Sequence, residues 1–138
     1  MPLSILVAVA GAARGRLGRI LAGHHVTFAA TLKEVRAAWK LARFDAVLVG
    51  THFDESTTFE ALREVLGSER PPPVICVRVL PFGHGLGEST MHAFRAACHA
   101  LGVSLVLDMV EYRDDPAGDR EVRRLLEGMV SSPSLRRL

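Results

Sequence analysis

The chain has 138 residues and a net charge of +2, with 49% hydrophobic and 23% charged residues. This length predicts one domain with a sizeable core, and the composition is that of a globular protein. No apolar run approaches the about 18 residues of a membrane span, and the first residues lack the basic start of a secretory signal. We therefore expect a cytoplasmic protein without membrane contact, in which Cys76 and Cys98 are buried free thiols.

The charge is unevenly distributed along the chain. Before Phe44 there are seven Lys or Arg residues and one acid, Glu34, whereas ten Lys or Arg and fourteen Asp or Glu follow. We expect the first two helices to present a basic face to solvent. Aromatic residues make up only 6% of the chain, which leaves few side chains to stack on bases. Nucleic acid is therefore not expected as a partner.

The first part of the chain alternates between apolar runs and helical patterns. Residues 3–10 form a continuous apolar run, typical of a parallel strand covered on both faces. A short helix is predicted over residues 12–22 and a strand over residues 26–30. Thr31 and Glu34 then predict a capping box, in which the Thr31 hydroxyl accepts from the Glu34 N–H. The helix that starts there is predicted to end at about residue 42.

The same alternation continues to the end of the chain. Strands are predicted over residues 46–49, 74–79 and 103–107, and helices over residues 57–66, 91–101 and 115–129. A second capping box is predicted at Thr57 and Glu60, Gly102 should end the fourth helix, and Asp115 should cap the last. The inward side chains of the last two helices are predicted to be Met91, Phe94, Cys98, Leu101, Val122, Leu125, Leu126 and Met129. The domain covers residues 1–130, and residues 131–138 are expected to be a flexible tail.

Five strand–helix units predict one parallel sheet with helices on both faces. Two strand orders remain open, the flavodoxin-like order 2-1-3-4-5 and a truncated dinucleotide-binding sheet. In either fold a ligand would bind beyond the carboxyl ends of the strands. That rim collects residues 10–11, 50–55, 78, 81–88 and 108–111.

Several segments are similar to receiver domains of bacterial two-component response regulators, the CheY-like family. They are residues 23–35 (Gly-His-His-Val-Thr-Phe-Ala-Ala-Thr-Leu-Lys-Glu-Val), 44–49 (Phe-Asp-Ala-Val-Leu-Val), 73–77 (Pro-Val-Ile-Cys-Val) and 100–103 (Ala-Leu-Gly-Val). The resemblance covers residues 4–130 and implies the α/β, flavodoxin-like fold with a five-stranded parallel sheet of order 2-1-3-4-5.

The residues that carry the chemistry of that family are replaced. Against the family pattern, Val9, Ala10 and Gly11 stand where an acidic pair holds Mg²⁺, and Gly50 stands at the phosphoacceptor aspartate. Arg78 replaces a hydroxyl residue, and Asp108 or Met109 replaces a lysine. Mg²⁺ needs carboxylate oxygens and an acyl phosphate needs a nucleophilic carboxylate. We therefore predict a degenerate receiver pocket with no phosphorylation, no metal and no cofactor, formed by Ala10, Gly11, Gly50, Arg78 and Asp108.

The resemblance also implies where a partner would bind. In the family the fourth helix, fifth strand and fifth helix form the output and dimer face. Here that face would carry His92, Arg95, His99, Tyr112, Arg120, Arg123 and Arg124. The predicted function is a phosphorylation-independent regulatory protein, not an enzyme, that binds a protein partner or itself. We also expect Arg78 to pair with Asp54, Glu55 or Asp108 and so to hold one conformation.

An alternative is a small NAD(P)- or nucleotide-binding protein. The glycines Gly11, Gly15 and Gly18 follow the first strand, as in turns that bring backbone N–H groups to a pyrophosphate, and Arg14 would suit a 2′-phosphate. These residues resemble the start of dihydrodipicolinate-reductase-like enzymes. A 3-2-1 strand order would favour this alternative. A metal site is not expected, because the rim residues His52, Asp54, His84, Asp108 and Glu111 match no compact motif. A small ligand at the rim is left open.

Overall fold

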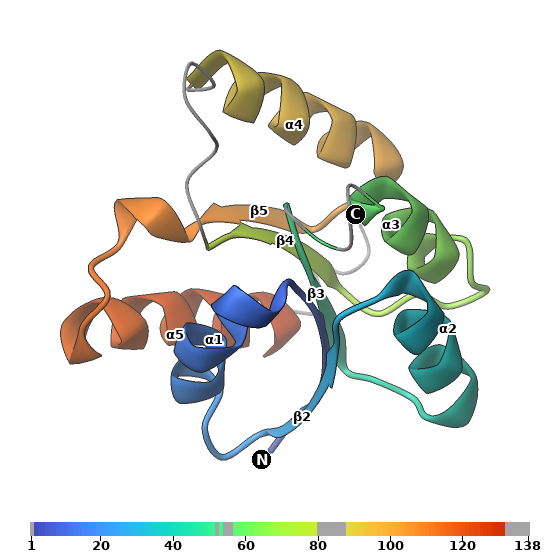
Figure 1. Cartoon of the computed structure of the whole chain (residues 1–138), viewed down its shortest axis with the longest axis horizontal. Coiled ribbons are helices and arrows are strands. Elements are labelled where there is room, and N and C mark those ends of the chain that lie inside the picture. The colour runs from blue at the N-terminus through green and yellow to red at the C-terminus, as the bar shows by residue number, and fades with distance from the viewer. Residues whose placement is uncertain (1, 52, 54–56, 80–87, 132–138) are drawn as a thin grey trace.

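A computed structural model describes residues 2–51, 53, 57–79 and 88–131. Strands and helices alternate along the chain, and the strands form one sheet that the helices flank (Figure 1). The strands are β1 (Ser4–Ala8), β2 (His25–Ala29), β3 (Ala46–Gly50), β4 (Val74–Arg78) and β5 (Leu105–Asp108). The helices are α1 (Arg14–Ile20), α2 (Leu32–Leu41), α3 (Thr58–Leu66), α4 (Glu88–Leu101) and α5 (Pro116–Ser131). Two 3₁₀ turns, η1 (Gly11–Ala13) and η3 (Met109–Glu111), precede α1 and α5.

The sheet has the order β2-β1-β3-β4-β5, and each neighbouring pair is parallel. This confirms the predicted flavodoxin-like arrangement. The strand order also excludes the 3-2-1 arrangement that would have favoured the dinucleotide-binding alternative. Ala8 is the register partner of Val49, and Arg78 is the register partner of Asp108. The carboxyl ends of β1, β3, β4 and β5 therefore meet at one rim.

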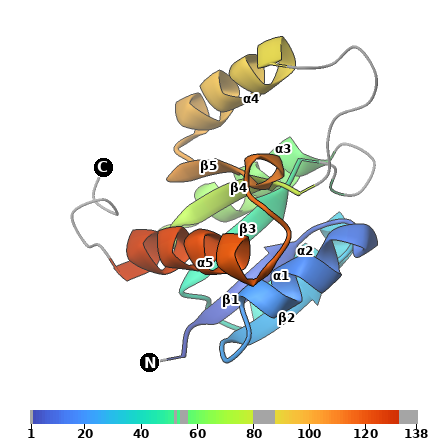
Figure 2. The ribbon, with the colours of Figure 1, turned by 90° about the vertical axis from the view of Figure 1, so that its left-hand side faces the viewer.

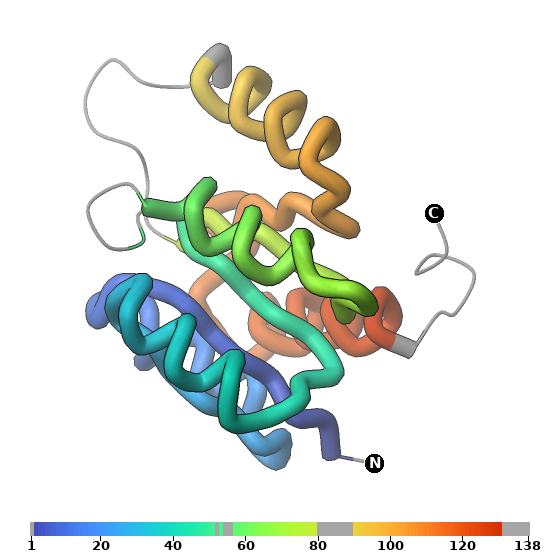
Figure 3. The backbone as a smooth tube through the Cα atoms, turned by 90° about the vertical axis from the view of Figure 1, so that its right-hand side faces the viewer, coloured from blue at the N-terminus to red at the C-terminus, as the bar shows by residue number. Residues whose placement is uncertain are grey.

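Helices cover both faces of the sheet. Figure 2 shows α1 and α5 on one face, and Figure 3 shows α2, α3 and α4 on the other. The side chains of each strand alternate between these layers. Val7 and Ile75 pack with α1 and α5, whereas Leu6 and Cys76 pack with α2, α3 and α4. The strands β3 and β4 are buried almost throughout because both of their faces are covered.

Two helix starts confirm the predicted caps. At α2, the Thr31 hydroxyl accepts from the Glu34 N–H at 3.1 Å, and the Glu34 carboxylate accepts from the Ala30 N–H at 3.2 Å. At α5, Asp115 Oδ1 accepts from the Gly118 N–H at 2.8 Å. Gly102 follows α4 with a φ of 96°, the left-handed conformation predicted for the end of that helix.

The second predicted capping box is wrong. Thr57 precedes α3 but makes no side-chain cap. Its neighbour Thr58 is buried and donates its hydroxyl hydrogen to the Gly50 carbonyl at 2.9 Å. The threonine that ties α3 to the sheet is therefore Thr58, because it faces the end of β3.

Two further expectations are corrected. The first helix was expected over residues 12–22, but a 3₁₀ turn precedes α1, whose α-helical part covers only Arg14–Ile20. Gly15 and Gly18 lower the helix propensity of that segment. On α5, Val122 and Leu126 face the core as predicted, whereas Leu125 is 42% exposed because it lies off their side of the helix.

The two cysteines are buried free thiols, as predicted. Their sulfur atoms lie 3.6 Å apart, one on β4 and one on α4. The hydrogen bond between the thiols, together with burial, raises the pKa of Cys76. In the described part of the chain, no helix is both long and apolar enough to span a bilayer. The predicted tail, apart from Ser131, lies outside the described residues.

Candidate functional site

The carboxyl ends of β1 and β3 meet in an apolar contact. Gly50 is the last residue of β3, and a Cβ atom added there would lie 3.2 Å from Val9 Cγ1. This distance is tighter than ordinary van der Waals contact, so Val9 fills the space in front of Gly50. The adjoining cavity has a volume of about 10 Å³, room for about one water molecule. Its lining is Val9, Ala10, Ala13, Gly50, Thr51, Val77 and Val79.

The ends of β4 and β5 are joined by an ion pair. Arg78 Nε donates to Asp108 Oδ1 at 2.9 Å, and Arg78 Nη2 donates to Asp108 Oδ2 at 2.5 Å. The Asp108 side chain is 3% exposed and that of Arg78 is 14% exposed. The hydrogen bond with Asp108 raises the pKa of the Arg78 guanidinium. Of the three acids predicted as partners of Arg78, Asp108 makes this pair, and Asp54 and Glu55 lie outside the described residues.

The Asp108 carboxylate also binds a backbone N–H group. Its Oδ1 atom also accepts from the Val110 N–H at 3.2 Å, which caps the 3₁₀ turn η3. Both carboxylate oxygens are therefore engaged. The pair leaves no free carboxylate at this position to act as a nucleophile or to bind a cation.

The predicted pocket residues fall into two groups. Ala10 and Gly50 line the small cavity, whereas Arg78 and Asp108 form the ion pair. Gly11 is exposed at the start of η1 and does not line the cavity. Among the described residues, no three His, Cys, Asp or Glu side chains lie together in a way that would hold a metal ion. Of the rim residues weighed as metal ligands, His52, Asp54 and His84 lie outside the described residues.

The residues of the dinucleotide alternative lie on the segment after β1. A Cβ atom at Gly11 or Gly15 would meet no protein atom within 4 Å, so neither glycine is required by a close approach of protein backbone. The Arg14 guanidinium lies over the Phe28 ring, 5.2 Å from its centroid. The strand order is not the 3-2-1 order that would have favoured this alternative.

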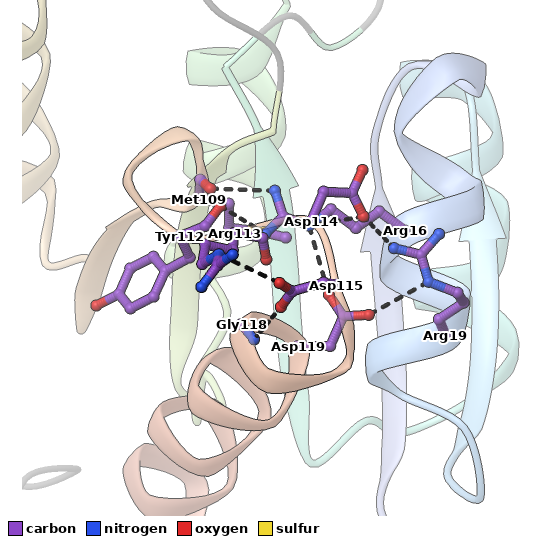
Figure 4. A network of polar contacts seen from close by, with 9 residues as sticks. All are labelled: Arg16, Arg19, Met109, Tyr112, Arg113, Asp114, Asp115, Gly118 and Asp119. Carbon is purple, nitrogen blue, oxygen red and sulfur yellow. Dashed lines mark hydrogen bonds and ion pairs between the residues drawn. The ribbon is translucent and has the colours of Figure 1, made fainter.

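The structure reveals an arginine whose role the sequence did not indicate (Figure 4). Arg16 of α1 is only 9% exposed and points into the segment that joins β5 to α5. Its Nη1 donates to the Met109 carbonyl at 3.1 Å, and its Nη2 donates to the carbonyls of Tyr112 and Arg113 at 3.1 and 3.0 Å. Its Nε atom lies 3.6 Å from Asp119 Oδ1. The guanidinium therefore holds α1 against the start of α5.

Arg19 lies beside Arg16 and completes this network. It pairs with Asp114 and, through its Nε at 3.2 Å, with Asp119. The hydrogen bonds with these two carboxylates raise the pKa of Arg19. The basic face expected on the first helix is therefore largely engaged within the molecule. We call Arg16, Arg19, Asp114 and Asp119 the α1–α5 clasp.

The predicted partner face is partly exposed. His92 and His99 are exposed on α4, and Arg120 is exposed on α5. Tyr112, which precedes α5 in the chain, is half-buried. Arg95 is exposed, yet its Nη1 donates to the Val106 carbonyl of β5 at 3.0 Å.

Arg123 differs from the other residues predicted on this face. Its Nη1 donates to the carbonyls of Ile20 and Ala22 at 3.1 and 2.6 Å, and its Nε donates to Glu127 at 3.0 Å. It therefore connects α5 to the end of α1.

Comparison with known proteins extends the fold assignment. No protein-family model and no curated protein matches the chain. Among solved structures, the receiver domain of a sensor histidine kinase from Pseudomonas aeruginosa, which holds a magnesium ion in its active-site cleft, has a TM-score of 0.64 and 22% identity. That match covers 96% of this chain and 100% of the other.

Two further solved structures give the same result. A response regulator from Thermotoga maritima has a TM-score of 0.72 and 12% identity, over 96% of this chain and 100% of that chain. The chemotaxis response regulator CheY4 of Vibrio cholerae has a TM-score of 0.69 and 19% identity, over 94% and 99%. The chain therefore has the CheY-like receiver fold that the sequence predicted.

Proposed function

We propose that this chain is a bacterial regulatory protein of the two-component type that acts in the cytoplasm without aspartyl phosphorylation. Its receiver-like domain would cover residues 1–130 and would not be an enzyme. The observation that supports this proposal is the end of β3, where the resemblance to receivers would place the acceptor: the residue there is Gly50, and Val9 Cγ1 lies 3.2 Å from the position that its Cβ would take. A phosphoryl transfer needs a carboxylate nucleophile at that point, and a glycine offers none.

The ion pair at the rim supports a protein held in one state. Arg78 and Asp108 bind each other with both carboxylate oxygens, so β4 and β5 are joined without any added group. Asp108 also caps η3, and the Met109 carbonyl of that turn accepts from Arg16. A continuous series of hydrogen bonds thus runs from the rim to α1. We infer that this series keeps the segment before α5 in a constant conformation.

The proposed output is binding of a protein, or of a second copy, through α4 and α5. This surface offers His92, His99 and Arg120, and Leu125 adds an apolar side chain that is 42% exposed. An exposed apolar side chain on the same helix as an exposed arginine is suited to a mixed protein interface. Arg123 is omitted from this surface because it binds α1.

The absence of phosphorylation can be tested directly. The protein is incubated with acetyl phosphate and Mg²⁺, and its intact mass is compared with that of CheY4 from Vibrio cholerae under the same conditions. We expect a phosphoryl adduct on the control and none on this protein. Because aspartyl phosphates hydrolyse spontaneously, the spectra are recorded immediately after incubation. The comparison is made under conditions in which the control carries the adduct. An adduct mapped to any aspartate of this chain would overturn the proposal.

The proposed surface can be tested with a matched pair of variants. Arg120→Glu reverses a charge on α5, and Arg63→Glu makes the same change on the exposed side of α3. Sedimentation velocity measures self-association, and affinity capture from the source cell measures partner retention. We expect Arg120→Glu to reduce the retained partner or dimer and Arg63→Glu to leave it unchanged. Equal retention by both variants would exclude α5 from the interface.

A further inference from the structure

The Lys and Arg residues before Phe44 fall into two groups, those with contacts inside the protein and those exposed to solvent. Those of the first helix are used internally: Arg16 binds backbone carbonyls, Arg19 pairs with two aspartates, and Arg14 stacks on Phe28. The remaining four, Lys33, Arg36, Lys40 and Arg43, lie on or directly after α2, and all four are exposed. The charge asymmetry of the sequence is therefore concentrated on one helix of the folded protein.

The cations on α2 line one side of the helix. Lys33, Arg36 and Lys40 are three and four residues apart, so their side chains are neighbours on the helix surface. With Ala37 and Leu41 they line an open groove of about 490 Å³. Leu41 is 86% exposed, the most exposed large apolar side chain in the described part of the chain. The groove thus combines positive charge with an apolar end.

A second groove flanks the end of the same helix. Its volume is about 550 Å³, and Arg43 and Arg70 contribute to its lining, with the stacked rings of Trp39 and Phe44 beneath. We call Lys33, Arg36, Lys40, Arg43 and Arg70 the α2 basic surface.

Three acids lie on or near the α2 basic surface: Glu34, Glu64 and Glu69. Glu34 binds the Ala30 N–H and the Thr31 hydroxyl at the start of the helix. Glu64 is 3.6 Å from Arg36, in an ion pair whose arginine is 52% and whose glutamate is 37% exposed, and Glu69 lines the second groove. Exposed pairs of this kind contribute little energy and are weakened by salt. Five cations against three acids leave a net positive surface beside an exposed leucine.

We propose that the α2 basic surface binds an acidic segment of a partner protein, with an apolar side chain of that segment covering Leu41. Carboxylates would be bound by the flanking lysines and arginines, and arginine can bind a carboxylate with two parallel hydrogen bonds. A protein segment fits better than nucleic acid, because the exposed Leu41 suits an apolar side chain, and the half-buried rings of Trp39 and Phe44 already stack on each other.

This surface is separate from the one in the proposed function. The helix α2 lies on the opposite face of the sheet from α5, and on its own face α3 lies between it and α4 (Figures 2 and 3). A partner bound to α2 would therefore leave Arg120 and Leu125 uncovered. The two proposals stand or fall independently.

The test uses the full chain and a labelled peptide of defined chemistry. The probe is a short fluorescent peptide with glutamates on both sides of one central leucine, and a second peptide has glutamine in place of every glutamate. Fluorescence anisotropy is compared for the wild type, for Lys33→Glu/Lys40→Glu on α2 and for Arg120→Glu/Arg124→Glu on α5. Both double variants change the net charge equally and replace exposed side chains, and circular dichroism verifies that they fold.

We expect the glutamate peptide to bind the wild type and the glutamine peptide not to bind. The α2 variant should raise the Kd about tenfold or more, whereas the α5 variant should change it by less than about twofold. Leu41→Gln should weaken binding by about threefold. Equal losses in both double variants, or no binding of the glutamate peptide, would overturn the proposal. Tighter binding of duplex DNA, or of phosphatidylcholine vesicles with phosphatidylglycerol, would also overturn it.

Discussion

The helices α1 and α2 both carry several basic residues, but those of α1 contact other parts of the protein and those of α2 are exposed to solvent. Both segments are rich in Lys and Arg, yet the guanidinium of Arg16 is buried against three carbonyl groups while Arg36 remains at the surface. The difference arises from what lies opposite each helix. The segment before α5 brings carbonyls and aspartates to α1, whereas α2 faces solvent on its basic side. A run of positive charge thus indicates a binding surface only after its internal acceptors are known.

The largest effect is expected for the α1–α5 clasp. Arg16→Ala should lower the free energy of unfolding by about 3 kcal/mol, because it leaves buried carbonyls without a donor and removes a buried partner of Asp119. Arg36→Ala, on the exposed helix, should change it by less than about 0.5 kcal/mol. Urea unfolding followed by circular dichroism measures both. Similar values for the two variants would contradict the contrast between α1 and α2.

A second, partly buried arginine, Arg78, lies at the rim of the sheet and is expected to have the next largest effect. Arg78→Met should lower the free energy of unfolding by about 2 kcal/mol, because it leaves the carboxyl group of Asp108, which is 3% exposed, without its donor. Adding Asp108→Asn should restore part of this loss, because the amide oxygen can still cap η3 without a buried charge. A double-mutant cycle by urea unfolding gives the coupling between the two side chains. Additive single effects would show that the ion pair does not join β4 to β5.

A smaller effect is expected where the rim is apolar. Gly50→Ala should lower the free energy of unfolding by about 1 kcal/mol, since the new Cβ would press on Val9 Cγ1. In Val9→Ala/Gly50→Ala this contact is absent, so the double variant should be less destabilised than the sum of its single variants. Thermal unfolding of the four proteins measures this coupling. If Gly50→Ala were as stable as the wild type, Val9 would not fill the space in front of Gly50.

The smallest expected effect lies where α5 meets the end of α1. Burial opposes ionisation of Glu127, but the hydrogen bond with His24 and the charge of Arg123 outweigh it and hold the pKa of Glu127 below its usual value. A carboxyl with a lowered folded pKa stabilises the protein above its unfolded pKa, and this contribution is lost as the pH falls through the folded value.

Glu127→Gln should therefore remove a small part of the acid sensitivity of the protein. Because the Glu127 side chain is 39% exposed, solvent screening limits its contribution to about 0.5 kcal/mol. Urea unfolding of wild type and variant, between about pH 6 and about pH 3, measures the difference. We expect the two curves to converge at the acid end. A constant difference at every pH would contradict the lowered pKa.

The fold was largely predictable because its signals are local or strongly patterned. The apolar runs of β3 and β4 and the capping box at Thr31 each depend on residues close together in the chain. The same holds for Asp115 before α5 and Gly102 after α4. Where the prediction was wrong, the packing of a helix against the sheet decided which of two neighbouring residues turned inward. Thr58, rather than Thr57, reached the Gly50 carbonyl, and Leu125 turned outward beside Leu126.

The placement of three rim residues at strand ends was predictable from the sequence, and their contacts were less so. Gly50, Arg78 and Asp108 were all selected from their positions at strand ends, which the parallel sheet brings to one rim. The choice of Asp108 as partner depends on β5 lying next to β4 in register. The packing of Val9 against Gly50 depends in the same way on the pairing of β1 with β3.

By itself, the sequence determined the alternation of strands and helices, the side chains that fill the core, and the absence of a carboxylate at Gly50. These properties follow from periodicity and residue identity, which act over a few positions. The tertiary structure alone decided that Arg16 and Arg123 are internal and that the cations of α2 are not. Their acceptors lie about a hundred positions away in the chain, and no local pattern records such a contact, because it exists only once α1 and α5 pack on the same face of the sheet.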